Sequence, residues 1–181
     1  MTSQGGAVQT YPNSQITFNN EPAIRSLTGL TSAFADGSTP SGSGFDYEYA
    51  YDIWLNGYGG HTHTELMIWN YNDGQSPVGN SAGSVTIDGH SYDVYEDGNF
   101  DTCSPSPCGG IYLALVATSN FTSGNDNLLD FFNYANSKGW ISGGSSGHLW
   151  QVDYGAEICS TNGTTATFDF TNFNVVPSYQ P

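Results

Sequence analysis

The chain has 181 residues and a mass of 19.4 kDa, a length that suits one domain with a sizeable core. It carries 17 Asp and Glu against 2 Lys and Arg, which gives a formal net charge of −15 at pH 7. Nucleic acid and anionic membranes are therefore excluded as partners, because almost nothing in the chain could neutralise phosphates. Aromatic residues make up 14% of the chain, which excludes intrinsic disorder. This composition suits a neutral ligand, above all a sugar.

The negative charge reflects a shortage of Lys and Arg more than an excess of acids. One hypothesis is adaptation to acid, where carboxylates become neutral and their mutual repulsion falls. The alternative is that the charge serves solubility and otherwise reflects compositional drift.

Strand-like segments follow one another along the chain. Residues 1–14 are polar and turn-like, and 34–46 form a loop rich in Gly, Ser and Pro. Alternating positions predict strands within 47–55, 64–70, 84–96, 110–119, 149–159 and 164–176. In 84–96 the pair Asp88-Gly89 predicts a hairpin turn. Short strands at this spacing predict an all-β sandwich or barrel in a single domain, 1–181.

One segment, at about 125–138, has helical instead of strand periodicity. Its apolar residues recur three and four positions apart: Leu128, Leu129, Phe131, Phe132 and Ala135. Asn125 or Asp126 is expected to cap the start, and Gly139 to close the end after Lys138. We therefore expect one α-helix packed on the β-structure.

Strand periodicity assigns side chains to faces, because alternate residues point in opposite directions. In 61–69 one face holds His61, His63, Glu65, Met67 and Trp69, and the other holds Leu66 and Ile68. In 152–159 one face holds Asp153, Gly155, Glu157 and Cys159, and the other holds Tyr154, Ala156 and Ile158. Asp52 and Trp54 likewise alternate with Tyr51 and Ile53. Three strands thus present carboxylates on a face that is not the natural core face.

Carboxylates beside large apolar side chains are either a cost to stability or a site. Indole rings such as those of Trp54 and Trp69 stack on sugars, and paired carboxylates cleave glycosidic bonds. The alternative is that these carboxylates lie on a solvent-exposed face of the sheet and only keep that face soluble.

Several segments resemble the signature segments of glycoside hydrolase family 12. They are TELMIW (64–69), AYDIWL (50–55), SPVGN (76–80) and YGAEICSTNG (154–163), with VQTYPNSQ (8–15) and FFNYANSKG (131–139) in the family's order. The resemblance implies a β-jelly-roll of two curved antiparallel sheets with an extended cleft. It also implies a retaining endo-β-1,4-glucanase that needs no cofactor or metal and acts on a β-glucan polysaccharide. Xyloglucan is the alternative substrate, and we expect a secreted monomer.

The resemblance also implies roles for single residues. Glu65 matches the nucleophile, Glu157 the general acid/base, and Asp52 the aspartate that hydrogen-bonds and tunes the nucleophile. Met67 and Trp69 match residues that line the subsites, Trp54 joins them as a substrate-binding residue, and Pro77 begins a loop on the aglycone side. The two catalytic carboxyls should lie about 5–5.5 Å apart. Repulsion should raise the pKa of Glu157, and hydrogen bonding should hold that of Glu65 down.

The chain departs from the family pattern at three places. The family has further strands before 8–15, so we expect a shortened N-terminal part with exposed sheet edges. Cys103 and Cys108 bracket Ser-Pro-Ser-Pro and could form a small disulfide loop, which would imply an oxidising compartment. Cys159 stands near the acid and is expected to be a packed small residue.

Two rival functions stay open. His61, His63 and Glu65 offer three metal ligands on one strand face, as in a cupin-like metalloenzyme, although solvent-facing or rim histidines explain them as well. A non-catalytic sugar-binding module on the same sandwich would explain the Trp residues, but it leaves the two matched carboxylates without a role.

Overall fold

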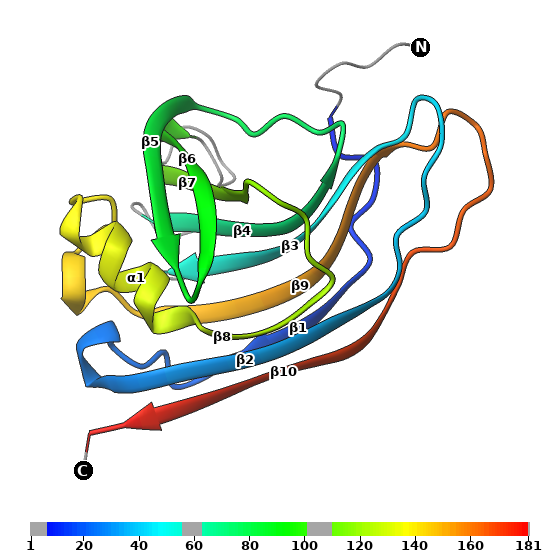
Figure 1. The fold of residues 1–181 in the computed structure, drawn as a ribbon. Coiled ribbons are helices and arrows are strands. Elements are labelled where there is room, and N and C mark those ends of the chain that lie inside the picture. Colours follow the sequence, from blue (N-terminus) through cyan, green and yellow to red (C-terminus); the bar gives the residue numbers. More distant parts are fainter. Residues whose placement is uncertain (1–6, 56–62, 101–109, 181) are drawn as a thin grey trace.

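The computed structural model describes residues 7–55, 63–100 and 110–180, which form a two-layer β-sandwich with one α-helix (Figure 1). The larger sheet has seven strands in the order β1-β9-β3-β4-β7-β6-β5, and the smaller has three in the order β10-β2-β8. The strands are β1 (Asn13–Thr17), β2 (Leu27–Ser38), β3 (Asp46–Leu55), β4 (His63–Asp73), β5 (Asn80–Ile87), β6 (His90–Phe100), β7 (Gly110–Ala117), β8 (Ser123–Asn127), β9 (Leu149–Ser160) and β10 (Asp169–Tyr179). The helix is α1 (Leu128–Ser137), and two 3₁₀ turns are η1 (Ile24–Ser26) and η2 (Gly144–Ser146). The predicted two-sheet jelly-roll with one packed helix is confirmed.

Neighbouring strands are antiparallel with one exception. β4 and β7 pair in parallel, from His63 opposite Gly110 to Trp69 opposite Val116. A parallel pair needs a long crossover, and the β5–β6 hairpin lies between these two strands in the sequence. The expectation of wholly antiparallel sheets is therefore wrong for this one pair.

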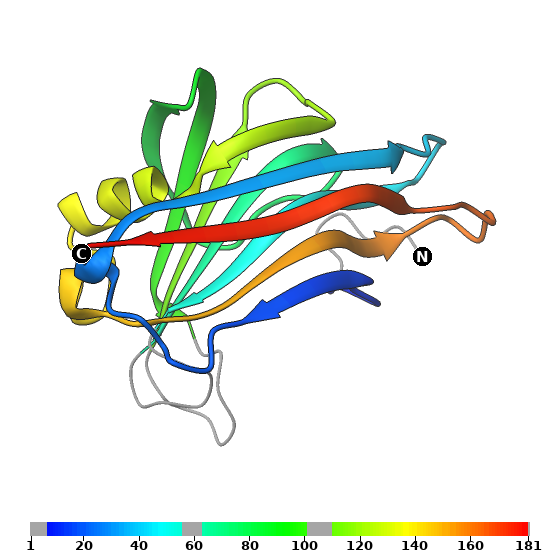
Figure 2. The same ribbon diagram turned by 90° about the horizontal axis from the view of Figure 1, so that it is seen from below.

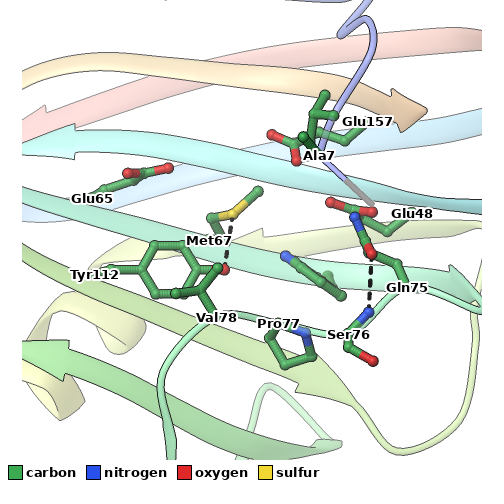
Figure 3. A pocket seen from close by; sticks show the side chains of 12 residues that line it. Ala7, Glu48, Glu65, Met67, Gln75, Ser76, Pro77, Val78, Tyr112 and Glu157 are labelled. Atoms are coloured by element: carbon green, nitrogen blue, oxygen red, sulfur yellow. Dashed lines mark hydrogen bonds between the residues drawn. The ribbon is translucent and has the colours of Figure 1, made fainter. Parts of the chain in front are cut away.

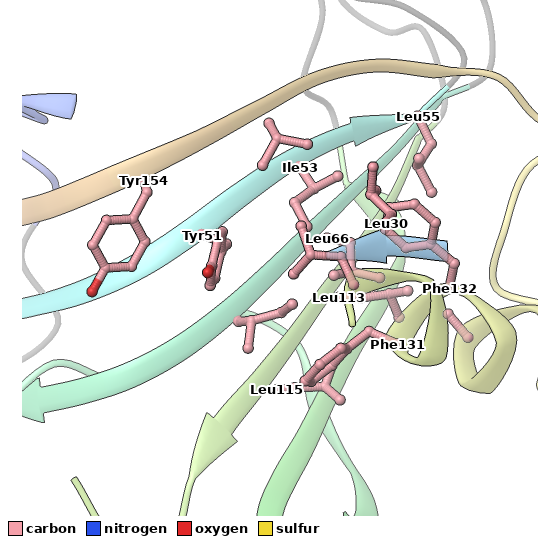
Figure 4. Close-up of a cluster of buried hydrophobic side chains, with 14 of the residues drawn as sticks. Leu30, Tyr51, Ile53, Leu55, Leu66, Leu113, Leu115, Phe131, Phe132 and Tyr154 are labelled. Atoms are coloured by element: carbon pink, nitrogen blue, oxygen red, sulfur yellow. The ribbon is translucent and has the colours of Figure 1, made fainter. Parts of the chain in front are cut away.

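The core lies between the two sheets and is rich in aromatic side chains (Figure 4). Alternate residues of β3 face it, beginning with Tyr47, Tyr49 and Tyr51, all with no exposed surface. From β4 it receives Leu66 and Ile68, as the alternation predicts. In Figure 2 the strands β2 and β10 of the smaller sheet lie in front of the larger sheet, so they cover its core face. The opposite face of the larger sheet is left to form a site.

Helix α1 closes one end of the core against β2. It begins at Leu128 after Asn127, whose side chain makes no capping bond to the helix backbone. The expected cap at Asn125 or Asp126 is wrong, because both residues belong to β8 and pair with β2. The expected end is confirmed: Lys138 is the C-cap, and Gly139 follows with a φ of 76°.

The predicted hairpin at Asp88-Gly89 is confirmed by φ values of 50° and 83° between β5 and β6. Three strands are additional to the sequence prediction, namely β1, β2 and β8, and the predicted 34–46 loop overlaps the end of β2. The last strand begins at Asp169, five residues later than predicted. Cys103 and Cys108 lie outside the described residues. In the part of the chain that the structure describes, no helix is long and apolar enough to cross a membrane.

Candidate functional site

The face of the larger sheet that points away from the core carries a second cluster of buried apolar side chains. This cluster consists of Ala50, Met67, Trp69, Tyr112 and Ala114, with Tyr95 and Val116 packed against it. Its members come from alternate positions of neighbouring strands, so they share one face by the strand period. They form an apolar floor at the centre of the sheet.

A cavity of about 440 Å³ lies over this floor (Figure 3). Its lining residues are Ala7, Val8, Glu48, Glu65, Met67, Trp69, Gln75, Ser76, Pro77, Val78, Tyr112 and Glu157. Five predicted site residues are therefore brought together: Glu65, Glu157, Met67, Trp69 and Pro77. In Figure 3, Met67 lies between the carboxylate of Glu65 and that of Glu157.

Asp52 and Trp54, which were also predicted, do not line this cavity. They lie on the same face of β3, where Trp54 stands opposite Glu65 and Asp52 opposite Met67. Trp54 Nε1 donates a hydrogen bond of 3.2 Å to Asp52 Oδ2, which fixes that carboxyl group. Within the described residues Asp52 makes no hydrogen bond to Glu65, so its link to the expected nucleophile is electrostatic.

Seven lining residues are additional to the predicted site residues, and among them Glu48, Tyr112 and Gln75 bring polar side chains to the cavity. Glu48 shares the face of Asp52 by the strand period, a signal present in YEYAYD (47–52) that could have found it. Tyr112 stands opposite Glu65 on β7, and its hydroxyl donates to Met67 Sδ at 3.4 Å. Gln75 comes from the segment after β4, and no local pattern would have placed it.

Burial dominates the electrostatics of the site. Glu48 has no exposed surface, Asp52 has 7% and Glu65 has 8%. Burial, then the charge of Glu157, raises the pKa of Glu65 to about 8. Burial, then the charge of Glu65, raises the pKa of Asp52 well above its usual value. The free site therefore favours neutral carboxyl groups.

The expectation that hydrogen bonding holds the pKa of Glu65 down is wrong, because burial and the charge of Glu157 both raise it. Within the described residues no donor bonds its carboxylate, and no cation faces it. The two Lys and Arg residues lie elsewhere: Arg25 Nη1 donates to Ser146, and Lys138 Nζ lies 5.5 Å from the ring centre of Tyr134. Burial also raises the pKa of Glu157, which agrees with the expectation in direction but not in cause, since the expected cause was repulsion.

Cys159 and His63, whose roles the sequence left open, do not line the cavity. Cys159 is buried and free, and Gln75 Nε2 donates to its Sγ. Burial raises its pKa to about 12, as expected for a packed thiol. His63 is buried with its ring 6.0 Å from that of Trp54, and His61 lies outside the described residues. Across the described ranges no group of three His, Cys, Asp or Glu could hold a metal ion.

Comparisons with known proteins agree with this fold. A cellulase derived from Cel12A of Rhodothermus marinus superposes with a TM-score of 0.81 at 23% identity, covering 96% of this chain and 76% of its own. The family 12 xyloglucanase of Bacillus licheniformis gives 0.78 at 25% identity, with 97% and 78% covered. The xyloglucanase domain of NopAA from Sinorhizobium fredii, solved with cellobiose, gives 0.73 at 22%, with 95% and 78% covered. A search of curated protein sequences found no match.

The family model described as glycosyl hydrolase family 12 matches residues 1–176. This match spans β1 to β10 almost completely, including the strands that carry the cavity. The chain belongs to glycosyl hydrolase family 12 and is a glycoside hydrolase of the cellulase type.

Proposed function

We propose that this protein is a retaining endo-β-1,4-glucanase that hydrolyses internal bonds of cellulose-type glucans. The observation that carries the proposal is one cavity that receives Glu65 from β4 and Glu157 from β9 over the apolar floor of Met67 and Trp69. Two carboxyl groups that flank a glycosidic bond are the machinery of glycoside hydrolysis. An apolar floor with an indole suits the faces of glucose rings.

The reaction is a double displacement. Glu65 attacks the anomeric carbon while Glu157 gives its proton to the leaving glycosidic oxygen, and a covalent glycosyl-enzyme forms. Glu157, now ionised, takes a proton from water, and the resulting hydroxide attacks the same carbon and releases Glu65. The anomeric configuration is retained because the carbon is inverted twice. A separation of about 5–5.5 Å between the carboxyls is expected for this course.

Glu65 must be ionised to attack, yet burial and the charge of Glu157 raise its pKa to about 8. Substrate hydroxyls would supply the hydrogen-bond donors that the described residues do not offer to Glu65, and so stabilise the ionised form. Asp52 tunes Glu65 from the neighbouring strand β3, where Trp54 donates a hydrogen bond to Asp52. The charge of Glu65 raises the pKa of Asp52, so the two carboxyl groups are not both ionised. We expect Trp54 on β3 and Pro77 in the loop after β4 to make further contacts with the substrate, beyond those of Met67 and Trp69.

The substrate is a neutral polysaccharide, which agrees with a net charge of −15 and a cavity without cations. We place the enzyme outside the cell as a monomer, acting in a single domain of residues 1–181. Xyloglucan is the second candidate, favoured by the 25% identity with the xyloglucanase of Bacillus licheniformis.

The test is release of reducing ends from carboxymethylcellulose, barley β-glucan and xyloglucan by the full chain. We expect hydrolysis of at least one polymer, and the fastest names the substrate. Proton NMR of the first products should show the β-anomer before mutarotation. Initial α-anomer would refute the retaining mechanism, and glucan binding without any hydrolysis would refute the enzyme in favour of a binding module.

A further inference from the structure

Glu48 and Glu157 form a pair of acids that the two-carboxylate mechanism does not use. They stand directly opposite each other on the antiparallel strands β3 and β9. Opposite residues in such a ladder have Cβ atoms about 4.5–5.5 Å apart and share one face. Both side chains line the cavity, and Figure 3 shows their carboxylates on the same side of Met67.

Glu48 is the more deeply buried member of this pair. Its side chain has no exposed surface, and neither carboxyl oxygen has a hydrogen-bond partner in the described structure. Glu157 is only half-buried. Two like charges directly opposite each other in a sheet destabilise it, so the pair is not expected to be doubly ionised.

The charged and titratable groups that face Glu48 are acids, phenols and a thiol. They are Asp46 on the same strand, Glu157 and Cys159 on β9, Tyr11 before β1, and Tyr112 on β7. No cation is among them. Burial, then the charge of Glu157, raises the pKa of Glu48 well above its usual value. A buried carboxyl in such surroundings keeps its proton, because an unpaired buried charge costs several kcal/mol.

A neutral carboxyl group has an O–H donor, and Glu157, whose carboxyl oxygens can accept a hydrogen bond, stands directly opposite Glu48 on the facing strand. We propose that Glu48 is a positioning residue that stays protonated and donates a hydrogen bond to Glu157. The catalytic consequence rests on the proposed role of Glu157 as acid/base. Glu157 gives its own proton to the glycosidic oxygen, and Glu48 keeps its proton and stabilises the carboxylate that results. The same bond aims that carboxylate at water in the second step.

Two variants separate the donor from the charge. Glu48→Gln keeps a donor and is always neutral, whereas Glu48→Met keeps the length and has no such donor. We expect Glu48→Gln to retain kcat within about threefold. Glu48→Met should lose about tenfold or more in kcat, because a hydrogen bond to a charged group is removed. The alkaline limb of the pH–activity profile of Glu48→Met should move to higher pH, because no hydrogen bond from residue 48 then offsets the rise that burial causes in the pKa of Glu157.

Carbon-13 NMR titration of the glutamate carboxyls tests the bond without any substrate. The chain contains five glutamates, so the spectrum is small enough to assign. The titration of Glu157 should move to higher pH in Glu48→Met and stay near wild type in Glu48→Gln. This readout stands even if none of the polymers is hydrolysed, so failure of the proposed function and failure of the Glu48 role are distinguishable.

Asp126→Asn is the matched control, since Asp126 is a buried acid on β8 outside the cavity. It should leave the pH profile and the Glu157 titration unchanged. If Glu48 were ionised, both Glu48 variants would lower the pKa of Glu157, and the proposal would be overturned. An unchanged Glu157 titration in a folded Glu48→Met variant would overturn it as well. Should Glu48→Met not fold, the direction of the shift in Glu48→Gln decides.

Discussion

Both faces of β3 bury polar groups, but only the groups on the core face are fully hydrogen-bonded. On the core face Tyr47, Tyr49 and Tyr51 have no exposed surface, and each hydroxyl donates a hydrogen bond. The acceptors are Pro40 O at 2.7 Å, Ser38 O at 2.8 Å and Ser32 Oγ at 2.9 Å, respectively. The core face therefore satisfies its polar atoms within the protein.

On the cleft face of the same strand, several buried polar atoms are left without partners, although Asp52 Oδ2 accepts a hydrogen bond from Trp54. Both carboxyl oxygens of Glu48 and Oδ1 of Asp52 are buried and make no hydrogen bond in the described structure. Unsatisfied buried groups weaken a fold, and native proteins hold few of them. The difference between the faces indicates that the core face serves stability, whereas the cleft face gives up stability for a ligand and for proton transfer.

Glu65→Gln and Glu157→Gln give the strongest test of this difference between the two faces. If the cleft face serves activity, both variants should lose activity without losing stability. We expect Glu157→Gln to lose about 10²–10⁴-fold in kcat on the best polymer, as for removal of a general acid. Glu65→Gln should lose at least as much, since no covalent intermediate can form. Neither variant should unfold the protein, because each removes a carboxyl that burial disfavours. Initial rates and thermal melts measure the two effects.

The matched control is Glu21→Gln, since Glu21 is exposed and lies before η1. It should leave kcat and the melting temperature near wild type. Activity losses in Glu65→Gln or Glu157→Gln that only follow a loss of folded protein would contradict the assignment of a catalytic pair.

Tyr154→Phe is the corresponding test of the core face. The Tyr154 hydroxyl donates to Asp36 Oδ1 at 2.5 Å and lies 3.1 Å from Asn70 Oδ1. Its loss removes a donor from a carboxyl group whose pKa burial already raises to about 6. We expect the free energy of unfolding to fall by about 1–3 kcal/mol, with kcat nearly unchanged below the melting range.

Urea unfolding measures this effect, and Tyr179→Phe serves as control because Tyr179 is 45% exposed on β10. A Tyr154→Phe variant as stable as wild type would mean that the core hydroxyls do not stabilise the fold, and the contrast between the faces would disappear.

The contrast itself could be read in part from the sequence. Alternation in β4 predicted that Leu66 and Ile68 enter the core while Glu65 and Met67 lie on the opposite face, and the burial clusters and the cavity lining agree. This prediction succeeds because the strand period is a local property. The same period applied to Glu48 would have given its face, but only its register with β9 reveals that it meets another acid.

Other parts of the fold depend on partners far away in the sequence. Residues 123–127 are SGNDN, which have no strand propensity, yet they pair with Thr31–Ala35 of β2. Asp36 and Ser38 look like loop residues, and pairing with β10 keeps them in a strand. The segment with Gln75 and Pro77 reaches the cavity through the turn after β4. Local patterns carry no signal for such non-local pairings, so this side of the site was predicted only where the family resemblance supplied it.

Asp52→Asn tests the cost of a buried acid on the cleft face through the pH dependence of the free energy of unfolding. Burial raises the pKa of Asp52 in the folded state, so its proton is held more tightly than in the unfolded chain. A raised folded-state pKa gives stability below the unfolded pKa, and that stability is lost as pH rises through the folded value. Asn has no proton to lose, so the variant should be more stable than wild type at pH 8, by about 1 kcal/mol.

At pH 4 the gain from Asp52→Asn should vanish, because the wild-type carboxyl is then neutral in the folded protein. Urea midpoints at the two pH values measure this, and Asp130→Asn, an exposed acid on α1, should show no such change. A gain that is equal at both pH values would assign the effect to packing instead of charge.

The smallest expected effect lies within the catalytic pair. The charge of Glu157 is the second cause, after burial, of the raised pKa of Glu65. Glu157→Gln removes that charge and keeps the shape, so the pKa of Glu65 should fall below about 8 while burial keeps it above its ordinary value. Carbon-13 titration of the four remaining glutamates would show the shift. If Glu65 titrates identically in both proteins, the two carboxyls do not interact across the cavity, and the double displacement loses its geometric basis.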